Sequence, residues 1–252
     1  MIKFLNCKID ISKGVFQPRI ETEFWTKKAI EEIQNKTIGL SRTLKILDIF
    51  SGSGCIGIAV LKNVRNSFVD FVDFDRKAIE QIKANLELNG VSDRYQIIMC
   101  NLFEKLKGKR YDFILANPPY VAQSRIFEVQ KSVLEEDPHL ALFGGKDGMK
   151  YIRIFLKKVA GYLKNEGIFY LEFDPSQKQE IEEICHSQNL SVRFYRDQFN
   201  KWRFLRAHKA KQTRQMSDVK CLKEKFEIRI SKQIKQKFIE ISTFSAKLIE
   251  IH

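Results

Sequence analysis

The chain of 252 residues lacks the features of a membrane or secreted protein. It has no uninterrupted apolar stretch near the roughly 20 residues that a helix needs to cross a bilayer. Its first residues, Met1-Ile2-Lys3-Phe4, do not lead into the apolar segment of a signal peptide. We therefore expect a cytoplasmic protein that has no membrane partner.

Cysteine is scarce and scattered. The five cysteines are odd in number and never stand in Cys-x-x-Cys spacing; they are Cys7, Cys55, Cys100, Cys185 and Cys221. This spacing argues against a disulfide framework and against a zinc site. We expect reduced cysteines and no bound metal.

Positive charge, in contrast, is abundant. The formal net charge is +13, and 44% of the residues are hydrophobic, which is enough to bury a full core in one or two domains. The charge favours an anionic partner such as RNA, DNA or a ribosome-associated protein. It does not choose among these partners.

Predicted strands and helices alternate along the chain. We expect a short hairpin turning at Gly14, a first helix capped by Thr22, and a later helix that Gly167 ends. The other expected helices cover 78–89 and 176–188; the expected strands cover 44–50, 67–74, 95–99, 111–116, 168–173, 191–196 and 202–207. This order predicts an α/β fold with a Rossmann-like, doubly wound, mainly parallel sheet and an antiparallel closing hairpin.

A glycine-rich turn, Ser51-Gly52-Ser53-Gly54-Cys55-Ile56-Gly57, joins the strand at 44–50 to an apolar helix. Asp73 follows about 20 residues later, where a carboxylate that binds a ribose belongs. These features predict a site for a nucleotide-type ligand. The glycines also satisfy the dinucleotide pattern, so a nicotinamide dehydrogenase has to be considered. The plainer alternative is a tight turn, with Asp73 capping the next helix.

Asn117-Pro118-Pro119-Tyr120 follows the apolar run at 111–116. The prolines end this strand abruptly, so Asn117 stands at the carboxyl end of a strand, where α/β proteins bind ligands. An amide side chain, backbone carbonyls and an aromatic ring can converge there on a small planar NH2 group. The alternative is a simple strand terminator, with Tyr120 in the core.

Taken together, these motifs resemble a class I S-adenosylmethionine-dependent methyltransferase. More closely, the chain resembles the HemK family of protein-(glutamine-N5) methyltransferases, which modify peptide chain release factors. The matching segments are Asp48-x-x-Ser51-Gly52-Ser53-Gly54, Asp73, Asn117-Pro118-Pro119-Tyr120, Arg19-Ile20-Glu21-Thr22-Glu23, Asp137-Pro138-x-x-Ala141-Leu142-x-Gly144-Gly145-x-Asp147-Gly148, and Asp197 with Arg203.

The resemblance implies a role for each matching residue. Asp48 and Ser51 belong to the cofactor-binding turn, and Gly52, Ser53 and Gly54 form the floor under the methionine part of S-adenosylmethionine. Asp73 binds the ribose hydroxyls, and Asn101 lies near the adenine. Asn117 and the Pro118 carbonyl hold the substrate amide, while Pro119, Tyr120 and Arg19 belong to the substrate side.

The chain departs from the family pattern at Ile20, Asn101 and Asp174, where the family usually has proline, aspartate and glycine. It also begins at the hairpin, without the family's N-terminal helical docking domain. We expect a methyltransferase domain over residues 1–206. Residues 207–252 are expected to form a basic amphipathic helical tail that packs on this domain or docks on a partner.

The resemblance implies methyl transfer to the glutamine of a Gly-Gly-Gln motif in a release factor. The chief alternative is a methyltransferase that acts on an exocyclic amine of adenine or guanine in RNA or DNA, which the positive charge favours. A catalytically silent interaction protein is a third hypothesis. The nicotinamide hypothesis is weakest, because it has no use for Asn117-Pro118-Pro119-Tyr120.

Overall fold

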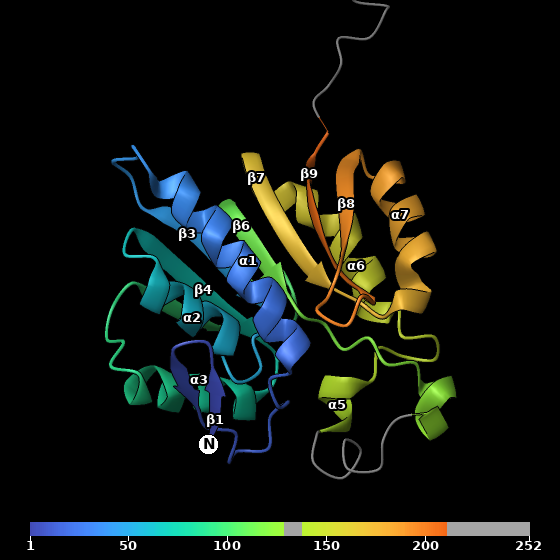
Figure 1. Cartoon of the computed structure of the whole chain (residues 1–252), viewed down its shortest axis with the longest axis horizontal. Helices are drawn as coiled ribbons and strands as arrows, with labels where there is room; N and C mark the ends of the chain where they lie inside the picture. Colours follow the sequence, from blue (N-terminus) through green and yellow to red (C-terminus); the bar gives the residue numbers. More distant parts are fainter. Residues whose placement is uncertain (129–137, 211–252) are drawn as a thin grey trace, which may run out of the picture. The chain divides into compact units, whose positions relative to one another are not determined.

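The computed structural model describes residues 1–128 and 138–210. Within this range the fold is built on a seven-stranded sheet of order β5-β4-β3-β6-β7-β9-β8 (Figure 1). Five strands are parallel, and the last two form an antiparallel hairpin. The strands are β3 (Leu44–Ile49), β4 (Ser67–Asp73), β5 (Tyr95–Met99), β6 (Tyr111–Ala116), β7 (Leu163–Glu172), β8 (Leu190–Arg196) and β9 (Trp202–Lys209). The predicted Rossmann-like sheet and its closing hairpin are confirmed.

Helices cover both faces of the sheet (Figure 1). One face carries α1 (Ile20–Thr37), α2 (Cys55–Asn63) and α3 (Arg76–Leu88). The other carries α6 (Lys150–Val159), the short η2 (Ala160–Tyr162) and α7 (Lys178–Ser187). Each face has its own hydrophobic core, because successive strand residues point to opposite sides. Leu47 and Ile49 thus enter one core, and Ile46 the other.

A separate two-stranded hairpin, β1 (Ile2–Phe4) and β2 (Cys7–Ile9), precedes α1. Side chains of α3 hold the chain here: the backbone N–H of Asp10 donates to Asn85 Oδ1 at 2.8 Å, and that of Lys13 to Gln81 Oε1 at 3.0 Å. The hairpin is confirmed, but it turns at Leu5 and Asn6 rather than at Gly14.

Two local predictions were wrong. Thr22 does not cap α1: the helix begins at Ile20, its N-cap is Arg19, and Thr22 is a buried residue of the first turn. Gly167 does not end a helix but lies inside β7. A β-carbon at Gly167 would lie 2.8 Å from the backbone oxygen of Tyr111 on the neighbouring strand, so this close approach of two backbones requires glycine.

Strand β9 ends at Lys209, three residues past the expected domain end at Arg206. The tail expected from 207 onward otherwise lies outside the described residues. The four cysteines of the described part, Cys7, Cys55, Cys100 and Cys185, are buried and unbridged, as expected; Cys221 lies outside it.

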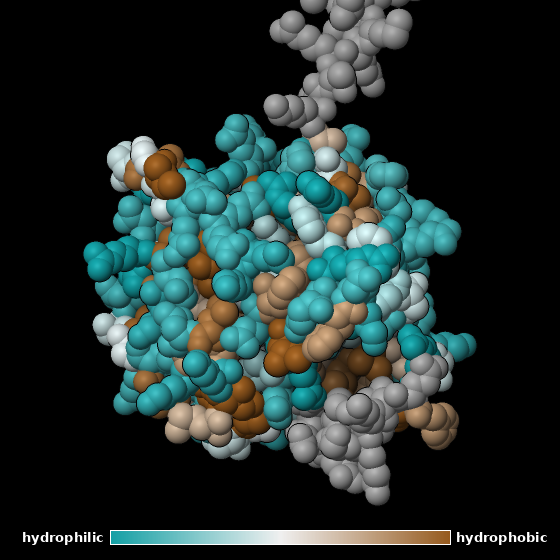
Figure 2. All heavy atoms as spheres, in the orientation of Figure 1, coloured by the Kyte–Doolittle hydropathy of each residue, from teal (hydrophilic) through white to brown (hydrophobic). Residues whose placement is uncertain are grey.

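The surface in Figure 2 is mostly hydrophilic, with hydrophobic side chains gathered low in the view. Among residues 1–128 and 138–210, no helix combines the length and apolar character of a membrane span. The same residues contain no group of three or more histidine, cysteine or acidic side chains arranged to hold a metal ion.

Candidate active site

The two predicted motifs meet where the strand order reverses. Along the strand order, β4 lies next to β3 in one direction, and β7 lies next to β6 in the opposite direction. Since Ile49 pairs with Ala116, the turns that follow β3 and β6 lie side by side at the carboxyl edge. Such a switch point is the usual ligand site of open α/β sheets.

One cavity at this edge brings most of the predicted site residues together. The predicted residues that line it are Arg19, Ser51, Gly52, Ser53, Asp73, Asn101, Asn117, Pro118, Pro119 and Tyr120. Asp48 and Gly54 are not among the lining residues. Phe16, Thr22, Phe50 and Tyr151 also line the cavity and were not predicted as site residues.

The three glycines of the first turn serve different purposes. Gly52 has φ +53°, and a β-carbon built on it meets no atom within 4 Å, so the space beside it is open. Gly54 has φ +78° and is the N-cap of α2, where its conformation favours glycine. A β-carbon on Gly57 would lie 2.3 Å from the Phe71 ring, so this glycine allows α2 to pack closely on β4.

Asp48 and Ser51 hold the glycine turn in place through hydrogen bonds. The fully buried carboxylate of Asp48 accepts the backbone N–H of Gly57 at Oδ2, at 2.9 Å, and burial raises its pKa well above the usual value. The Ser51 hydroxyl lies 2.7 Å from the Asp48 carbonyl oxygen and accepts the Val72 N–H at 2.9 Å. These contacts join the turn to β4.

Asp73 lies at the end of β4 and faces the glycine turn. Its Oδ2 accepts the Gly52 N–H at 2.9 Å, and its Oδ1 accepts the Asp75 N–H at 3.0 Å. Burial raises the pKa of Asp73. The cap of α3 is Asp75, which accepts the Lys77 N–H, so Asp73 is not the helix cap that the plainer alternative supposed. A carboxylate has about four acceptor sites, so Asp73 can still accept ligand hydroxyls.

Asn117 stands directly after β6. Because Ala116 pairs with Leu171 on β7, Asn117 emerges beside Glu172. The side-chain nitrogen of Asn117 donates to Thr22 Oγ1 at 3.3 Å. The Tyr120 hydroxyl donates to Glu172 Oε1 at 3.0 Å, and burial raises the pKa of Tyr120 well above its usual value. Residues from α1, β7 and the turn after β6 therefore meet at the cavity wall.

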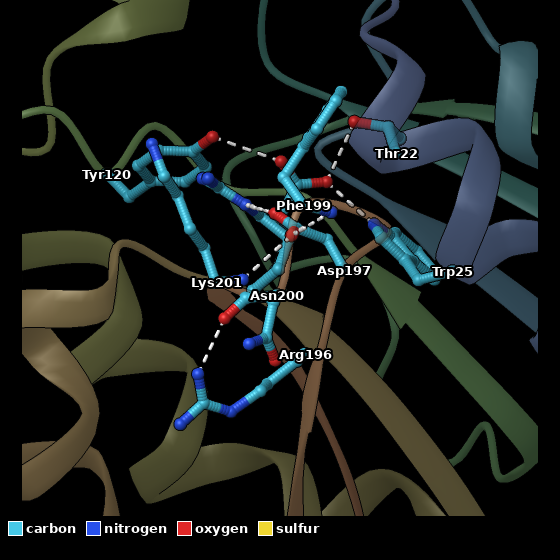
Figure 3. A network of polar contacts seen from close by, with 10 residues as sticks. Thr22, Trp25, Tyr120, Arg196, Asp197, Phe199, Asn200 and Lys201 are labelled. Carbon is cyan, nitrogen blue, oxygen red and sulfur yellow. Dashed lines mark hydrogen bonds and ion pairs between the residues drawn. The ribbon is translucent and has the colours of Figure 1, made fainter.

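The centre of this cluster is Glu172, a fully buried carboxylate that sequence reasoning did not select. Its partners Thr22, Trp25 and Tyr120 are labelled in Figure 3. Its Oε2 accepts the Thr22 hydroxyl at 2.8 Å and the Trp25 indole N–H at 2.6 Å. Burial raises the pKa of Glu172, while these hydrogen bonds and the charge of Arg203 favour ionisation. The available signal was an acidic residue at the end of the apolar run at 168–173.

The loop that contains Gly144 and Gly148 packs directly on the backbone of Asn117-Pro118-Pro119-Tyr120. Val121 and Gly144 are bonded through the backbone, with Gly144 N–H donating to Val121 O at 3.0 Å. A β-carbon on Gly144 would lie 2.4 Å from the Pro119 oxygen. Two short helices belong to this region, η1 (Gln123–Glu128) and α5 (His139–Leu142). The family motif at 138–148 thus acts as a close-fitting support; its first residue, Asp137, lies outside the described residues.

The predicted pair of Asp197 and Arg203 closes the turn between β8 and β9. Figure 3 shows Asp197 with Phe199, Asn200 and Lys201 of this turn. Asp197 accepts the backbone N–H groups of Phe199 and Lys201, and its Oδ2 accepts Arg203 Nε at 3.1 Å. Asp174, where the family usually has glycine, caps the short helix η3 (Pro175–Gln177). Gln177 in turn donates to the Tyr120 backbone oxygen at 2.9 Å.

The two remaining predicted residues lie at the cavity wall. The Arg19 guanidinium lies 5.3 Å from the centre of the Phe16 ring. The side-chain nitrogen of Asn101 donates to Glu104 Oε1 at 3.2 Å. The lining thus combines an open glycine turn, the half-buried carboxylate of Asp73 and apolar side chains such as Leu102. This set of groups fits a nucleoside ligand such as S-adenosylmethionine.

Comparison with known proteins agrees with this fit. The family model of the methyltransferase small domain matches residues 11–171. Release factor glutamine methyltransferases from Thermodesulfovibrio yellowstonii and Streptococcus pneumoniae are each 32% identical, over 75% and 80% of this chain. A methyltransferase structure from Pyrococcus furiosus has a TM-score of 0.56 at 17% identity, covering 82% of this chain and 90% of that one, and supports the fold.

The chain spans about two thirds of the length of the two similar enzymes, 66% of the first and 70% of the second. The match of the family model extends over the glycine turn, Asp73, Asn117-Pro118-Pro119-Tyr120 and the strand that precedes Glu172. The chain therefore belongs to the methyltransferase small domain family and, within it, to the HemK group of release factor glutamine methyltransferases.

Proposed function

We propose that this protein transfers a methyl group from S-adenosylmethionine to the side-chain amide nitrogen of a glutamine in a peptide chain release factor. The observation that carries the proposal is that the glycine turn, Asp73 and Asn117 line one cavity. The names of the similar enzymes from Thermodesulfovibrio yellowstonii and Streptococcus pneumoniae support the substrate.

The cofactor half of the site consists of the glycine turn, Asp73 and Asn101. Gly52 and Ser53 would lie under the methionine part, Asp73 would accept the ribose hydroxyls, and Asn101 would lie near the adenine. When bound, S-adenosylmethionine supplies an electrophilic methyl group on a positively charged sulfur. Asp48, Ser51 and Gly54 act indirectly, because they hold the turn in shape.

The amide half has to align a poor nucleophile, since the lone pair of an amide nitrogen is delocalised into the carbonyl. The Asn117 side-chain oxygen and the Pro118 carbonyl would accept the two N–H bonds and fix the direction of the nitrogen. Alignment of this kind can lower a barrier by about 7–11 kcal/mol. Pro119 and the half-buried Tyr120 would line the amide pocket and keep it poor in water.

The substrate side extends beyond the amide pocket. Arg19 lines the cavity at the start of α1 and would contact the release factor. The net charge of +13 favours a transient contact with RNA or the ribosome. The proposed reaction would accompany translation in the cytoplasm. The basic tail would dock on an acidic surface of the release factor or the ribosome; beyond Ala210 it lies outside the described residues.

The test is transfer of label from S-adenosylmethionine to release factor, RNA and DNA in separate reactions. We expect label on release factor alone, with mass spectrometry locating the methyl on the Gly-Gly-Gln glutamine. Replacing that glutamine by glutamate would set carboxylate oxygens against the Asn117 oxygen and the Pro118 carbonyl. This change should lower the rate of methyl transfer roughly 10⁴-fold or more. Asn117→Ala should lose transfer and keep cofactor binding.

Other results would select a different function. A methyl on a nucleobase, with none on glutamine, would establish the exocyclic amine of adenine or guanine as the substrate. Cofactor binding without transfer to any of the three substrates would favour the silent interaction protein.

A further inference from the structure

The contact between Asn117 and Thr22 determines which end of the Asn117 amide faces the cavity. Thr22 has one hydroxyl hydrogen, and its Oγ1 lies 2.8 Å from Glu172 Oε2. The same oxygen lies 3.3 Å from the side-chain nitrogen of Asn117. If Thr22 donates to Glu172, its oxygen can only accept from Asn117, so the NH2 end of the amide must face Thr22.

The surroundings of Glu172 make its Oε2 a hydrogen-bond acceptor, so the Thr22 hydroxyl must donate to it. The Trp25 indole N–H can only donate, and it lies 2.6 Å from the same Oε2, so this oxygen is an acceptor. The Tyr120 hydroxyl lies 3.0 Å from the other oxygen, Oε1. Burial raises the pKa of Glu172, and the positive charge of Arg203 acts against this rise. The donors Thr22, Trp25 and Tyr120 come from two chain segments, α1 and the turn after β6, and converge on this one buried carboxyl group (Figure 3).

The orientation of Asn117 follows from this arrangement. A reversed amide would place its oxygen against Thr22 Oγ1, which has no second hydrogen to donate. Because the NH2 end faces Thr22, the side-chain oxygen is directed to the other side, and Asn117 itself lines the cavity.

We propose that Thr22 and Glu172 are positioning residues that keep the Asn117 side-chain oxygen toward the cavity, so that the site selects a hydrogen-bond donor such as an NH2 group over a carboxylate. The substrate part of this inference rests on the proposed function. Neither residue needs to touch the reacting atoms, because both act through Asn117. Glu172 does not line the cavity.

Thr22→Val removes the hydroxyl but keeps the shape of the side chain. We expect about a tenfold or greater loss in discrimination between release factor with glutamine and with glutamate in the Gly-Gly-Gln motif, from the loss of one hydrogen bond that orients Asn117. Cofactor affinity should stay unchanged. Thr22→Ser restores the hydroxyl and should restore discrimination.

Thr26→Val is the matched control. Thr26 lies one turn further along α1, is fully buried, and its hydroxyl has no hydrogen-bond partner within the described residues. Its substitution alters the same helix in the same way without touching Asn117, so discrimination should stay at the level of the unmodified protein. An equal loss in both threonine variants would show a general effect of the helix and overturn the proposal.

A second readout needs no substrate. The side-chain NH2 resonances of Asn117, assigned by their absence in Asn117→Ala, should shift in Thr22→Val and keep their positions in Thr22→Ser and Thr26→Val. Unmoved resonances in Thr22→Val would overturn the proposal. If the resonances shift as expected but the unmodified protein does not methylate glutamine, the positioning role stands and the proposed substrate fails.

Discussion

A β-carbon placed on Gly148 would lie 2.2 Å from the backbone oxygen of Tyr120, and Gly148 has φ +79°. The supporting loop therefore touches the proposed substrate half of the site and leaves no room for a side chain at Gly148. The clash is with backbone, which cannot rotate away as a flexible side chain can.

Gly148→Ala should consequently move Tyr120 and lower methyl transfer at least tenfold, while leaving cofactor affinity nearly unchanged. Gly108→Ala is its control, since Gly108 has φ +83° but no atom within 4 Å of its β-carbon position. Both variants should lose about 1–2 kcal/mol of stability from the left-handed backbone. Equal transfer rates in the two variants would refute the supporting role of the loop.

Asp73→Ala tests the proposal that the Asp73 carboxylate binds the ribose. It removes a charged acceptor, and we expect cofactor binding to weaken by about 1.5–3 kcal/mol, the range for hydrogen bonds to a charged group. Isothermal titration calorimetry measures this loss, and thermal unfolding separates it from loosening of the Gly52 turn, whose N–H Asp73 accepts. Unchanged affinity would remove Asp73 from the cofactor site.

Asp112 should make stability depend on acid pH. Burial disfavours its ionised form, but hydrogen bonds from Arg42 and Lys164 outweigh this and hold its pKa below the ordinary value of 3.8. A depressed folded pKa stabilises the protein at neutral pH, and this contribution is lost as the pH falls below the ordinary value and through the lower folded value.

Asp112→Asn should thus lower the free energy of unfolding at pH 7 by about 1.5–3 kcal/mol, and the gap to the unmodified protein should narrow below pH 4. Asp93→Asn is the control, because the Asp93 side chain is 76% exposed and should change stability little. Denaturant unfolding across this pH range measures both. If the stability difference between Asp112→Asn and the unmodified protein stayed constant down to strongly acid pH, the depressed pKa of Asp112 would be contradicted.

Trp25→Phe should destabilise the protein through Glu172. The indole N–H donates to the buried carboxylate at 2.6 Å, so its loss should cost about 1.5–3 kcal/mol. The half-buried Trp202, which stacks on Arg196, provides the control, because Trp202→Phe keeps an aromatic face there. Comparable melting temperatures for the two variants would argue against a structural role of the Glu172 hydrogen bonds.

The parts of the site that sequence could predict are local in the chain. The glycine turn and Asn117-Pro118-Pro119-Tyr120 each end an apolar strand, and the strand order of an α/β fold brings such ends together. The strands were recognisable for the same reason, since each is a short apolar run between polar turns.

The parts that sequence could not predict depend on contacts between distant segments. Threonine is a residue type that often caps helices, so the sequence alone favours a cap at Thr22. Only its contact with Glu172, 150 positions later, shows that it is a buried donor. Gly167 follows a helical pattern in the sequence, as a glycine that ends a helix does. It lies inside β7 instead, where the backbone of β6 approaches closely. The support of Tyr120 by Gly148 is likewise visible only in three dimensions.

The position of Glu172 at the end of β7 also affects the order in which the protein can become competent during synthesis. The ribosome releases the glycine turn, Asp73 and Asn101 first, and Asn117 soon after. The carboxylate that orients Thr22, Trp25 and Tyr120 emerges only some fifty residues after Tyr120. A nascent chain that already carries every residue of the proposed cofactor half therefore still lacks the carboxylate that the proposed orientation of Asn117 requires.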